Sequence, residues 1–145
     1  MKERKKELLD KYKKALMGSK LFTAGTVMKV LGMQRKRSTF NTWVQRGVLI
    51  ATIPAKGAGT QAMYNVGDIL TAVVVQKLRE IRLDLAIASD IARLSPLYSG
   101  SILWYDIETQ EHSYMGMMDG LPDRNALLVI NIDRIIEEVI QKLDI

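Results

Sequence analysis

The chain has 145 residues, of which 48% are hydrophobic, and it contains no cysteine. Its mean hydropathy is close to zero, which indicates one folded domain, or a small domain with an appendage, rather than a disordered chain. The absence of cysteine excludes thiolate metal sites and thiol redox sensing. No apolar run reaches the roughly 20 residues of a membrane-spanning helix, and the charged start does not suit a signal peptide. We therefore expect a cytoplasmic protein without a membrane partner.

The charge is unevenly distributed along the chain. Residues 1–60 contain 14 Lys or Arg against 3 Asp or Glu, a net charge of +11, whereas residues 61–145 contain 7 against 13, a net charge of −6. A strongly basic first part favours a polyanion such as nucleic acid as its partner. The alternative is an uneven charge distribution without functional meaning.

Residues 2–17 are predicted to form a helix that Gly18 ends. Seven of its residues are Lys or Arg, and its apolar stripe is thin, consisting of Leu8 or Leu9, Tyr12 and Leu16. Three roles remain open for this basic N-terminal segment, residues 1–20. It can grip phosphates and add non-specific affinity, dock on the body of the protein, or be a frayed, solvated terminus.

Two further helices are predicted next. Thr23 is suited to cap a helix over residues 24–31, which Gly32 ends. The second helix spans residues 35–46, and its apolar residues fall on one face at spacings of three and four: Phe40, Trp43 and Val44. The opposite side is polar, consisting of Arg35, Ser38, Thr42, Gln45 and Arg46, with Asn41 on the flank. Arg pairs with guanine edges and amides pair with adenine, so this helix suits a DNA groove; a solvated amphipathic helix is the alternative.

A hairpin and two more helices are predicted to follow. Residues 48–53 and 62–64 are spaced for two strands, joined by the flexible loop 54–61, which contains Lys56 and Gln61. Such a wing can lie beside the preceding helix on the DNA backbone or in a minor groove. Asp68 is expected to open a helix to about Ile81, and Asp84 another that ends before Pro96.

The last part, residues 96–145, is predicted to be a small αβ appendage. Strands are expected at 101–107, 113–118 and 126–130, with a turn at 108–112, before a final helix from Asp133. That helix has a wide apolar stripe: Ile132, Ile135, Ile136, Val139, Ile140 and Leu143. Because the strands are too small to cover it, we expect the stripe to hold a homodimer. The alternative is that the helix packs on its own chain, against Val73, Leu78 or Ile91.

No residue pattern indicates catalysis. The only histidine, His112, falls in a predicted turn, and a metal site would need further convergent ligands. Residues 57–60 are not a P-loop, because no Gly-Lys-Ser/Thr ends them. Trp104 and Tyr105 can line a ligand pocket, although packing in a core or interface is the favoured interpretation. We therefore expect no enzyme, catalytic residue, metal site or cofactor, and nothing identifies a small-molecule effector.

The resemblance to a known family lies in residues 22–94. In chain order, this range contains Phe22-Thr23, Val30-Leu31-Gly32, Trp43 with Gly47-Val48-Leu49, Tyr64, Asp68-Ile69-Leu70, Leu78-Arg79 and Leu83-Asp84-Leu85. With these residues it resembles the DNA-binding domain of MerR-family bacterial transcriptional regulators. The resemblance implies an α+β, mainly helical fold, with a winged helix-turn-helix in residues 21–95. It also implies a recognition helix at 36–46, a wing at 53–64 and contact of Tyr64 with the DNA backbone. The family's long dimerisation helix is replaced here by the αβ appendage.

The expected function is sequence-specific binding of double-stranded DNA by a bacterial or phage transcriptional regulator. Helix 35–46 would read the major groove and the 53–64 wing would contact the backbone. An architectural DNA factor and a protein-interaction adaptor with the same winged fold are the alternatives. Twelve residues are expected to contact DNA: Thr23, Arg35, Lys36, Arg37, Ser38, Asn41, Thr42, Gln45, Arg46, Lys56, Gln61 and Tyr64.

Overall fold

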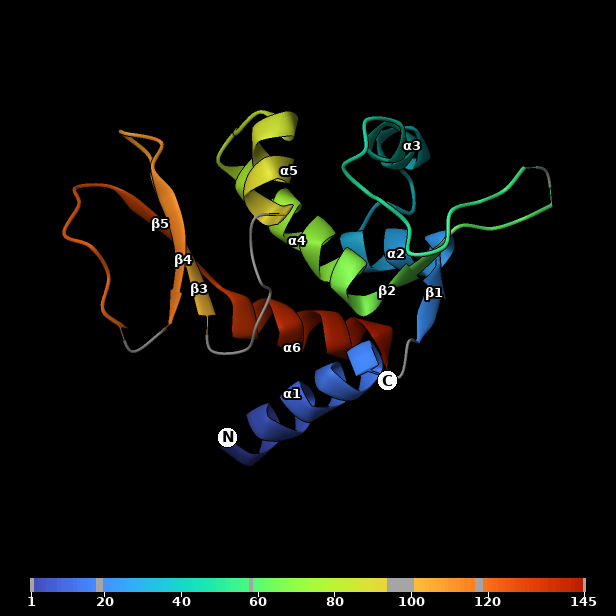
Figure 1. The fold of residues 1–145 in the computed structure, drawn as a ribbon, viewed down its shortest axis with the longest axis horizontal. Coiled ribbons are helices and arrows are strands. Elements are labelled where there is room, and N and C mark those ends of the chain that lie inside the picture. The colour runs from blue at the N-terminus through green and yellow to red at the C-terminus, as the bar shows by residue number, and fades with distance from the viewer. Residues whose placement is uncertain (1, 18–19, 58, 94–100, 117–118, 145) are drawn as a thin grey trace.

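A central helix organises the structure. The structure is a computed structural model, and it describes residues 2–17, 20–57, 59–93, 101–116 and 119–144. The described residues form an α+β fold with six helices and two small antiparallel sheets. In Figure 1 the helix α4 runs through the middle, with α2 and α3 on one side and α6 and α1 on the other. The larger sheet lies at one end of the long axis, and a projecting loop lies at the other. In the part described, no helix is both long and apolar enough to cross a membrane.

The helices are α1 (Lys2–Met17), α2 (Ala24–Leu31), α3 (Arg37–Gln45), α4 (Val66–Glu80), α5 (Leu85–Arg93) and α6 (Ile132–Leu143). The strands are β1 (Leu21–Thr23), β2 (Met63–Asn65), β3 (Ser101–Asp106), β4 (His112–Gly116) and β5 (Leu127–Asn131). β1 pairs with β2, and the larger sheet has the order β4-β3-β5. The predicted order of helices and strands is confirmed, except that β1 was not anticipated and the strand expected at 48–53 is not formed. The expected helix end at Gly18 and strand end at 117–118 lie outside the described residues.

Local capping explains where the helices begin and end. The Thr23 hydroxyl accepts a hydrogen bond from the Thr26 amide at 3.3 Å, and Gly32 ends α2 in the left-handed region with φ 67°. Both caps confirm the sequence prediction. The start of α4 was placed too late. Asn65 is its N-cap, and Asp68 completes a reciprocal capping box from inside the first turn.

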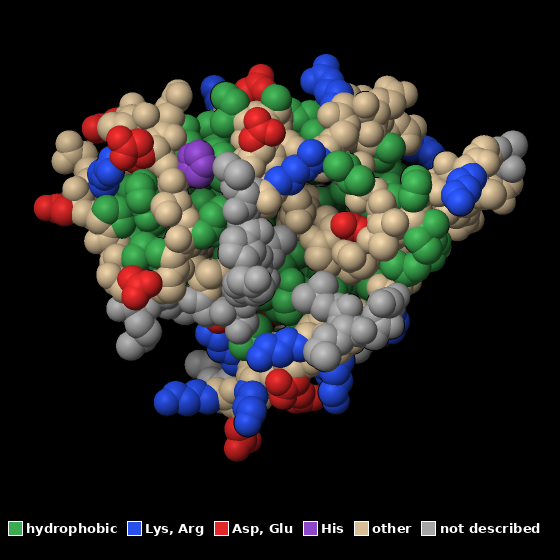
Figure 2. All heavy atoms as spheres, in the orientation of Figure 1, with side chains coloured by type: hydrophobic (Ala, Val, Ile, Leu, Met, Phe, Trp, Pro, Cys, Tyr) green, Lys and Arg blue, Asp and Glu red, His purple; other side chains and the backbone are tan. Residues whose placement is uncertain are grey.

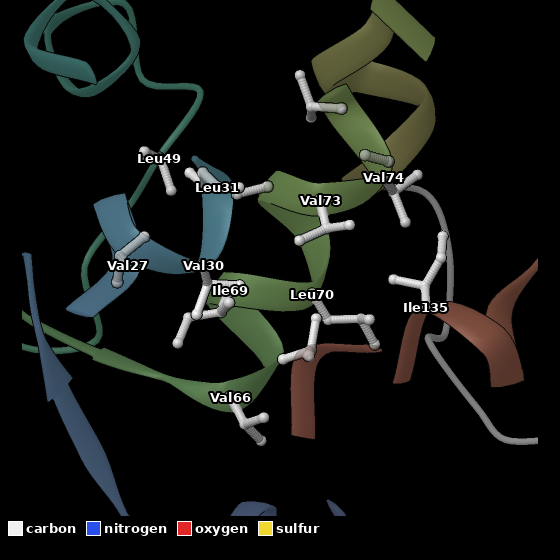
Figure 3. Close-up of a cluster of buried hydrophobic side chains, with 14 of the residues drawn as sticks. Val27, Val30, Leu31, Leu49, Val66, Ile69, Leu70, Val73, Val74 and Ile135 are labelled. Atoms are coloured by element: carbon white, nitrogen blue, oxygen red, sulfur yellow. The ribbon is translucent and has the colours of Figure 1, made fainter. Parts of the chain in front are cut away.

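The core forms around α4, which is apolar on most of its sides. Figure 3 shows Val66, Ile69, Leu70, Val73 and Val74 on this helix, surrounded by side chains from α2, from α6 and from the segment after α3. A helix that is hydrophobic all round must be covered all round. The cluster of buried residues extends from α1 to α6 and includes the larger sheet, so the αβ appendage shares one core with the rest of the chain.

The apolar stripe of α6 is buried within the same chain. Leu143, the sixth residue of the stripe, is partly buried against the core. The other five are buried: Ile132, Ile135, Ile136, Val139 and Ile140. This corrects the expectation that the stripe is uncovered and forms a homodimer surface. The small strands did not have to cover the stripe, because α1 and α4 pack against α6.

Among the three roles left open for the N-terminal helix, the structure shows docking on the body. Leu8, Tyr12 and Ala15 are buried in the core beside α6. The Lys5 ammonium also lies 3.2 Å from the carboxylate of Asp133, which is buried at the start of α6. The other basic residues of α1 remain exposed or partly exposed.

The predicted hairpin over 48–53 and 62–64 is not formed as two regular strands. In the described residues β2 pairs with β1, and only an isolated bridge joins Ile53 to Met63. The amides of Val48 and Leu49 instead donate to the Trp43 carbonyl at 2.9 and 3.2 Å. Gly47, with φ 70°, reverses the chain there. The apolar run therefore closes the end of α3 and is not available as a strand.

Replacing Ile136 by Asp should unfold the chain rather than dissociate a dimer. Ile136 is 0% exposed, and a carboxylate buried among apolar groups costs on the order of 4 kcal/mol or more. Thermal unfolding followed by circular dichroism measures the loss. Gln141→Asp, at an exposed position of the same helix, should cost less than about 1 kcal/mol. A folded Ile136→Asp chain of halved mass would contradict this placement of α6.

The stability of the fold should fall at alkaline pH partly through Tyr12. Burial raises the pKa of Tyr12 to about 12, whereas a phenol in the unfolded chain ionises near 10. The stabilisation is therefore complete below pH ~10 and is lost as pH rises through the folded pKa, by at most about 1.4 kcal/mol per pH unit. In urea unfolding over this range, Tyr12→Phe should show a shallower decline than the wild type. Parallel declines would show that Tyr12 does not contribute.

Candidate nucleic-acid interface

The polar face of α3 is presented to solvent by two aromatic anchors. Phe40 and Trp43 are buried under the helix, and they orient the opposite face outward. That face brings together most of the predicted contact residues, all of them exposed: Arg35, Lys36, Arg37, Ser38, Asn41, Gln45 and Arg46. The three guanidinium groups, two amides and one hydroxyl on this face can hydrogen-bond base edges and phosphates.

Three details of this helix differ from the prediction. The helix begins at Arg37, so Arg35 and Lys36 lie in the preceding turn, and Arg46 is its C-cap. Thr42 is half-buried, and its hydroxyl donates to the Ser38 carbonyl at 2.9 Å. The prediction that Val44 faces inward is wrong, since its side chain is 40% exposed. The two aromatic side chains fill the contact with the body without it.

The prediction that Tyr64 contacts DNA is also wrong. Tyr64 is 1% exposed and meets the ring of Phe40 edge to face, with 6.4 Å between centroids. Burial is the main cause of its raised pKa, and the charge of Asp68 adds to it. Tyr64 therefore supports α3 from below. It lies opposite Phe22 in the β1–β2 pair, so this small sheet is fastened to the helix.

A hollow of about 350 Å³ lies between α2, α3 and the loop that follows. It is lined by Thr23, Ala24, Gly25, Arg37, Gln61 and Ala62, so it joins three predicted contact residues from distant parts of the chain. The lining includes the start of α2, where backbone amides and the helix dipole favour an anion. The Arg37 guanidinium adds a full positive charge. These groups are suited to hold a phosphate.

The loop between α3 and β2 projects away from the body (Figure 1). Its root is tied to α4, because the Thr52 hydroxyl donates to Asp68 at 2.5 Å. Near its tip the Lys56 amide donates to the Thr60 hydroxyl, which itself donates to the Gly57 carbonyl. Lys56 is exposed. Ile50 and Ile53 at the base of this loop are exposed as well, which the expectation of a regular strand did not anticipate.

The basic residues of the first part of the chain form two surfaces. Figure 2 shows Lys and Arg side chains gathered over α1 at the bottom, and separate Lys or Arg side chains in the upper part of the molecule and on the projecting loop. The body of α4 and α6 separates these helices in Figure 1. The surface on α1 is also mixed, because Glu3, Glu7 and Asp10 are exposed among its cations. α1 and α3 therefore lie on different sides of this body.

Beside the larger sheet, Arg124 bonds with two carboxylates, Asp106 and Glu111. Arg124 lies 3.2 Å from Asp106 and 2.6 Å from Glu111, and it stacks over Trp104 at 5.4 Å. Asp106 also accepts hydrogen bonds from the amides of Glu108 and Thr109, and these bonds, the Thr109 amide first, lower its pKa. This arrangement is structural, since the carboxylate of Asp106 is enclosed by its partners. Among the described residues, no three potential ligands are grouped for a metal ion.

Comparison with known proteins adds no family. No protein-family model matches the chain, and no curated protein sequence matches it. The surface formed by α3, the α2 N-terminus and the loop is therefore the basis for assigning a function.

Truncating Tyr64 should destabilise the protein, because its ring is buried beneath α3 rather than exposed for binding. Tyr64→Ala removes a buried ring and should cost about 3–5 kcal/mol. Tyr64→Phe keeps the edge-to-face contact and should cost no more than about 1.5 kcal/mol. Urea unfolding measures both values. Similar stabilities for the wild type and Tyr64→Ala would contradict the placement of this ring beneath α3.

Proposed function

We propose that this protein binds double-stranded DNA sequence-specifically and acts as a transcriptional regulator of bacterial or phage type. The observation that carries the proposal is the exposed polar face of α3, which begins at Arg37 beside the hollow at the N-terminus of α2. Base-reading groups and a phosphate cradle thus lie on one surface. Such a combination fits a helix in a major groove with its register set by the flanking backbone.

Within this proposal, Asn41, Gln45 and Arg46 read base edges. Their side chains are exposed, and amide and guanidinium groups are those that discriminate adenine and guanine. Arg37 and Gln61 hold a phosphate against the start of α2, while Lys36 and Lys56 neutralise phosphates on either side. Contacts of this second kind add affinity without sequence preference.

The order of elements also supports a MerR-like winged helix-turn-helix. α2 and α3 follow one another across a turn, the loop projects like a wing, and α4 and α5 follow. The β1–β2 pair closes the base of the loop. The bridge between Ile53 and Met63 supplies a rudimentary hairpin. A homodimer that reads two half-sites is part of the same proposal, because one helix-turn-helix covers only a few base pairs.

One observation favours a second function, that of a protein-interaction adaptor. Val44, Ile50 and Ile53 are exposed apolar residues around α3 and the loop root. Apolar side chains can contact thymine methyl groups, but they equally suit a protein partner. If the protein is instead an architectural DNA factor, the same surface should bend the DNA that it binds. Duplex affinity at low salt separates the adaptor from both DNA-binding functions.

Footprinting on genomic fragments, followed by fluorescence anisotropy on the preferred site, tests the proposal. Asn41→Ala or Arg46→Ala should cost about 1–3 kcal/mol on that site and relax its sequence preference. Lys36→Gln and Lys56→Gln should weaken all sequences alike, and each should reduce the salt slope by about 1. Affinity that stays flat from about 50 to 200 mM salt would refute DNA binding through this surface.

Matched variants on α1 serve as the control. Lys6→Gln and Lys13→Gln remove the same charge from exposed positions on the other side of the body. They should leave the salt slope nearly unchanged. Deleting the helix is not a suitable control, because Leu8, Tyr12 and Ala15 belong to the core.

A further inference from the structure

β5 is an edge strand without the features that usually protect an edge. It lies at the end of the order β4-β3-β5, and no described strand pairs with its outer side. Its sequence, Leu-Leu-Val-Ile-Asn, contains neither a charge nor a proline. Val129 at its centre is 42% exposed. Uncharged apolar edges of this kind are normally covered or paired.

The hydrogen-bonding pattern shows which peptide groups face outward. The Ile107 amide donates to the Ala126 carbonyl at 3.0 Å, in the same register as the β3–β5 pairs. Because bonded pairs alternate in an antiparallel ladder, Leu128 and Ile130 exchange hydrogen bonds with β3. Leu127 and Val129 therefore direct their amides and carbonyls away from the sheet.

A groove of about 290 Å³ runs along this edge. It is lined by four consecutive residues, 128–131. Since successive side chains of a strand point to opposite faces, four in a row line a groove only if the edge itself faces it. The other walls come from the end of α4 and from α6, and the buried side chains of Ile130 and Ile135 contribute apolar lining.

The rim of the groove carries both signs of charge in equal number. Lys77 and Arg134 are its cations, and Glu80 and Glu138 are its anions. A rim without net charge does not favour an acidic or a basic peptide. It is self-complementary, however, as an interface between identical copies related by a two-fold axis must be.

We propose that two copies of this chain associate by antiparallel pairing of their β5 strands, with Val129 opposite Val129 of the second copy. The two three-stranded sheets would then form one continuous sheet. The larger sheet lies at the opposite end of the molecule from the projecting loop (Figure 1), so pairing leaves α3 exposed in both copies. The pairing itself requires no DNA, and it supplies the second half-site reader of the proposed function.

Sedimentation equilibrium of the full chain at micromolar concentration, without DNA, tests this pairing. The wild type should have twice the mass of one chain. Val129→Pro removes an amide that points outward and leaves the hydrogen bonds to β3 intact. Proline is tolerated at such a position of an edge strand. This substitution should raise the dimer dissociation constant at least about tenfold. Val129→Thr keeps the amide and the β-branched shape, and it should remain dimeric. Val129→Lys blocks the edge by charge and serves if the proline variant does not fold.

Cross-linking provides a second readout, because the wild-type chain has no cysteine. Val129→Cys should form a disulfide-linked dimer on oxidation, whereas Ile87→Cys, exposed on α5, should not. A monomeric wild type overturns the inference, and so does a dimer insensitive to both blocking variants. A mass that keeps rising with concentration would also overturn it, since a two-fold interface closes. Duplex binding is measured separately, so either proposal can fail alone.

Discussion

The burial of α4 on nearly all sides is the constraint on which the rest of the structure depends. A helix with so little polar surface must be enclosed, and the elements that enclose it come from both ends of the chain. α2 and the turn after α3 cover one side, and α5 and α6 cover others. Burial of apolar surface is the dominant favourable term in folding. The helix α3 and the αβ appendage are thus held by one common helix.

The end of α2 shows how closely these parts are connected. Its last carbonyls have no partners within the helix. The Gln76 amide of α4 donates to the Leu31 carbonyl at 2.7 Å, and the Lys142 ammonium of α6 donates to the Val30 carbonyl at 3.3 Å. A cation near a helix C-terminus is favourable. The last helix of the chain therefore helps to position the helix that precedes α3, although 112 positions separate the two residues.

The net charge of a stretch of sequence does not show that its charged residues lie on separate surfaces of the folded protein. The basic excess of residues 1–60 divides between α1, which is docked on α6, and the face formed by α3 and the loop. The apolar segments of the last part of the chain also differ in their surroundings. The stripe of α6 is internal, while the uncharged edge of β5 faces a groove. DNA binding is accordingly proposed for one end of the molecule and self-association for the other.

The sequence by itself determined the local features, because these depend on residues a few positions apart. The Thr23 cap, the Gly32 turn, the polar face of α3 and most helix and strand ranges follow from propensity and periodicity. Only the tertiary structure decided which apolar surfaces meet. Tyr64 and the stripe of α6 have the same local pattern whether covered or exposed, and the partners that bury them are distant in sequence. Residues 48–49 close α3 through local hydrogen bonds to the Trp43 carbonyl, although their apolar run has the spacing of a strand. Periodicity records that a face is apolar and does not record what covers it.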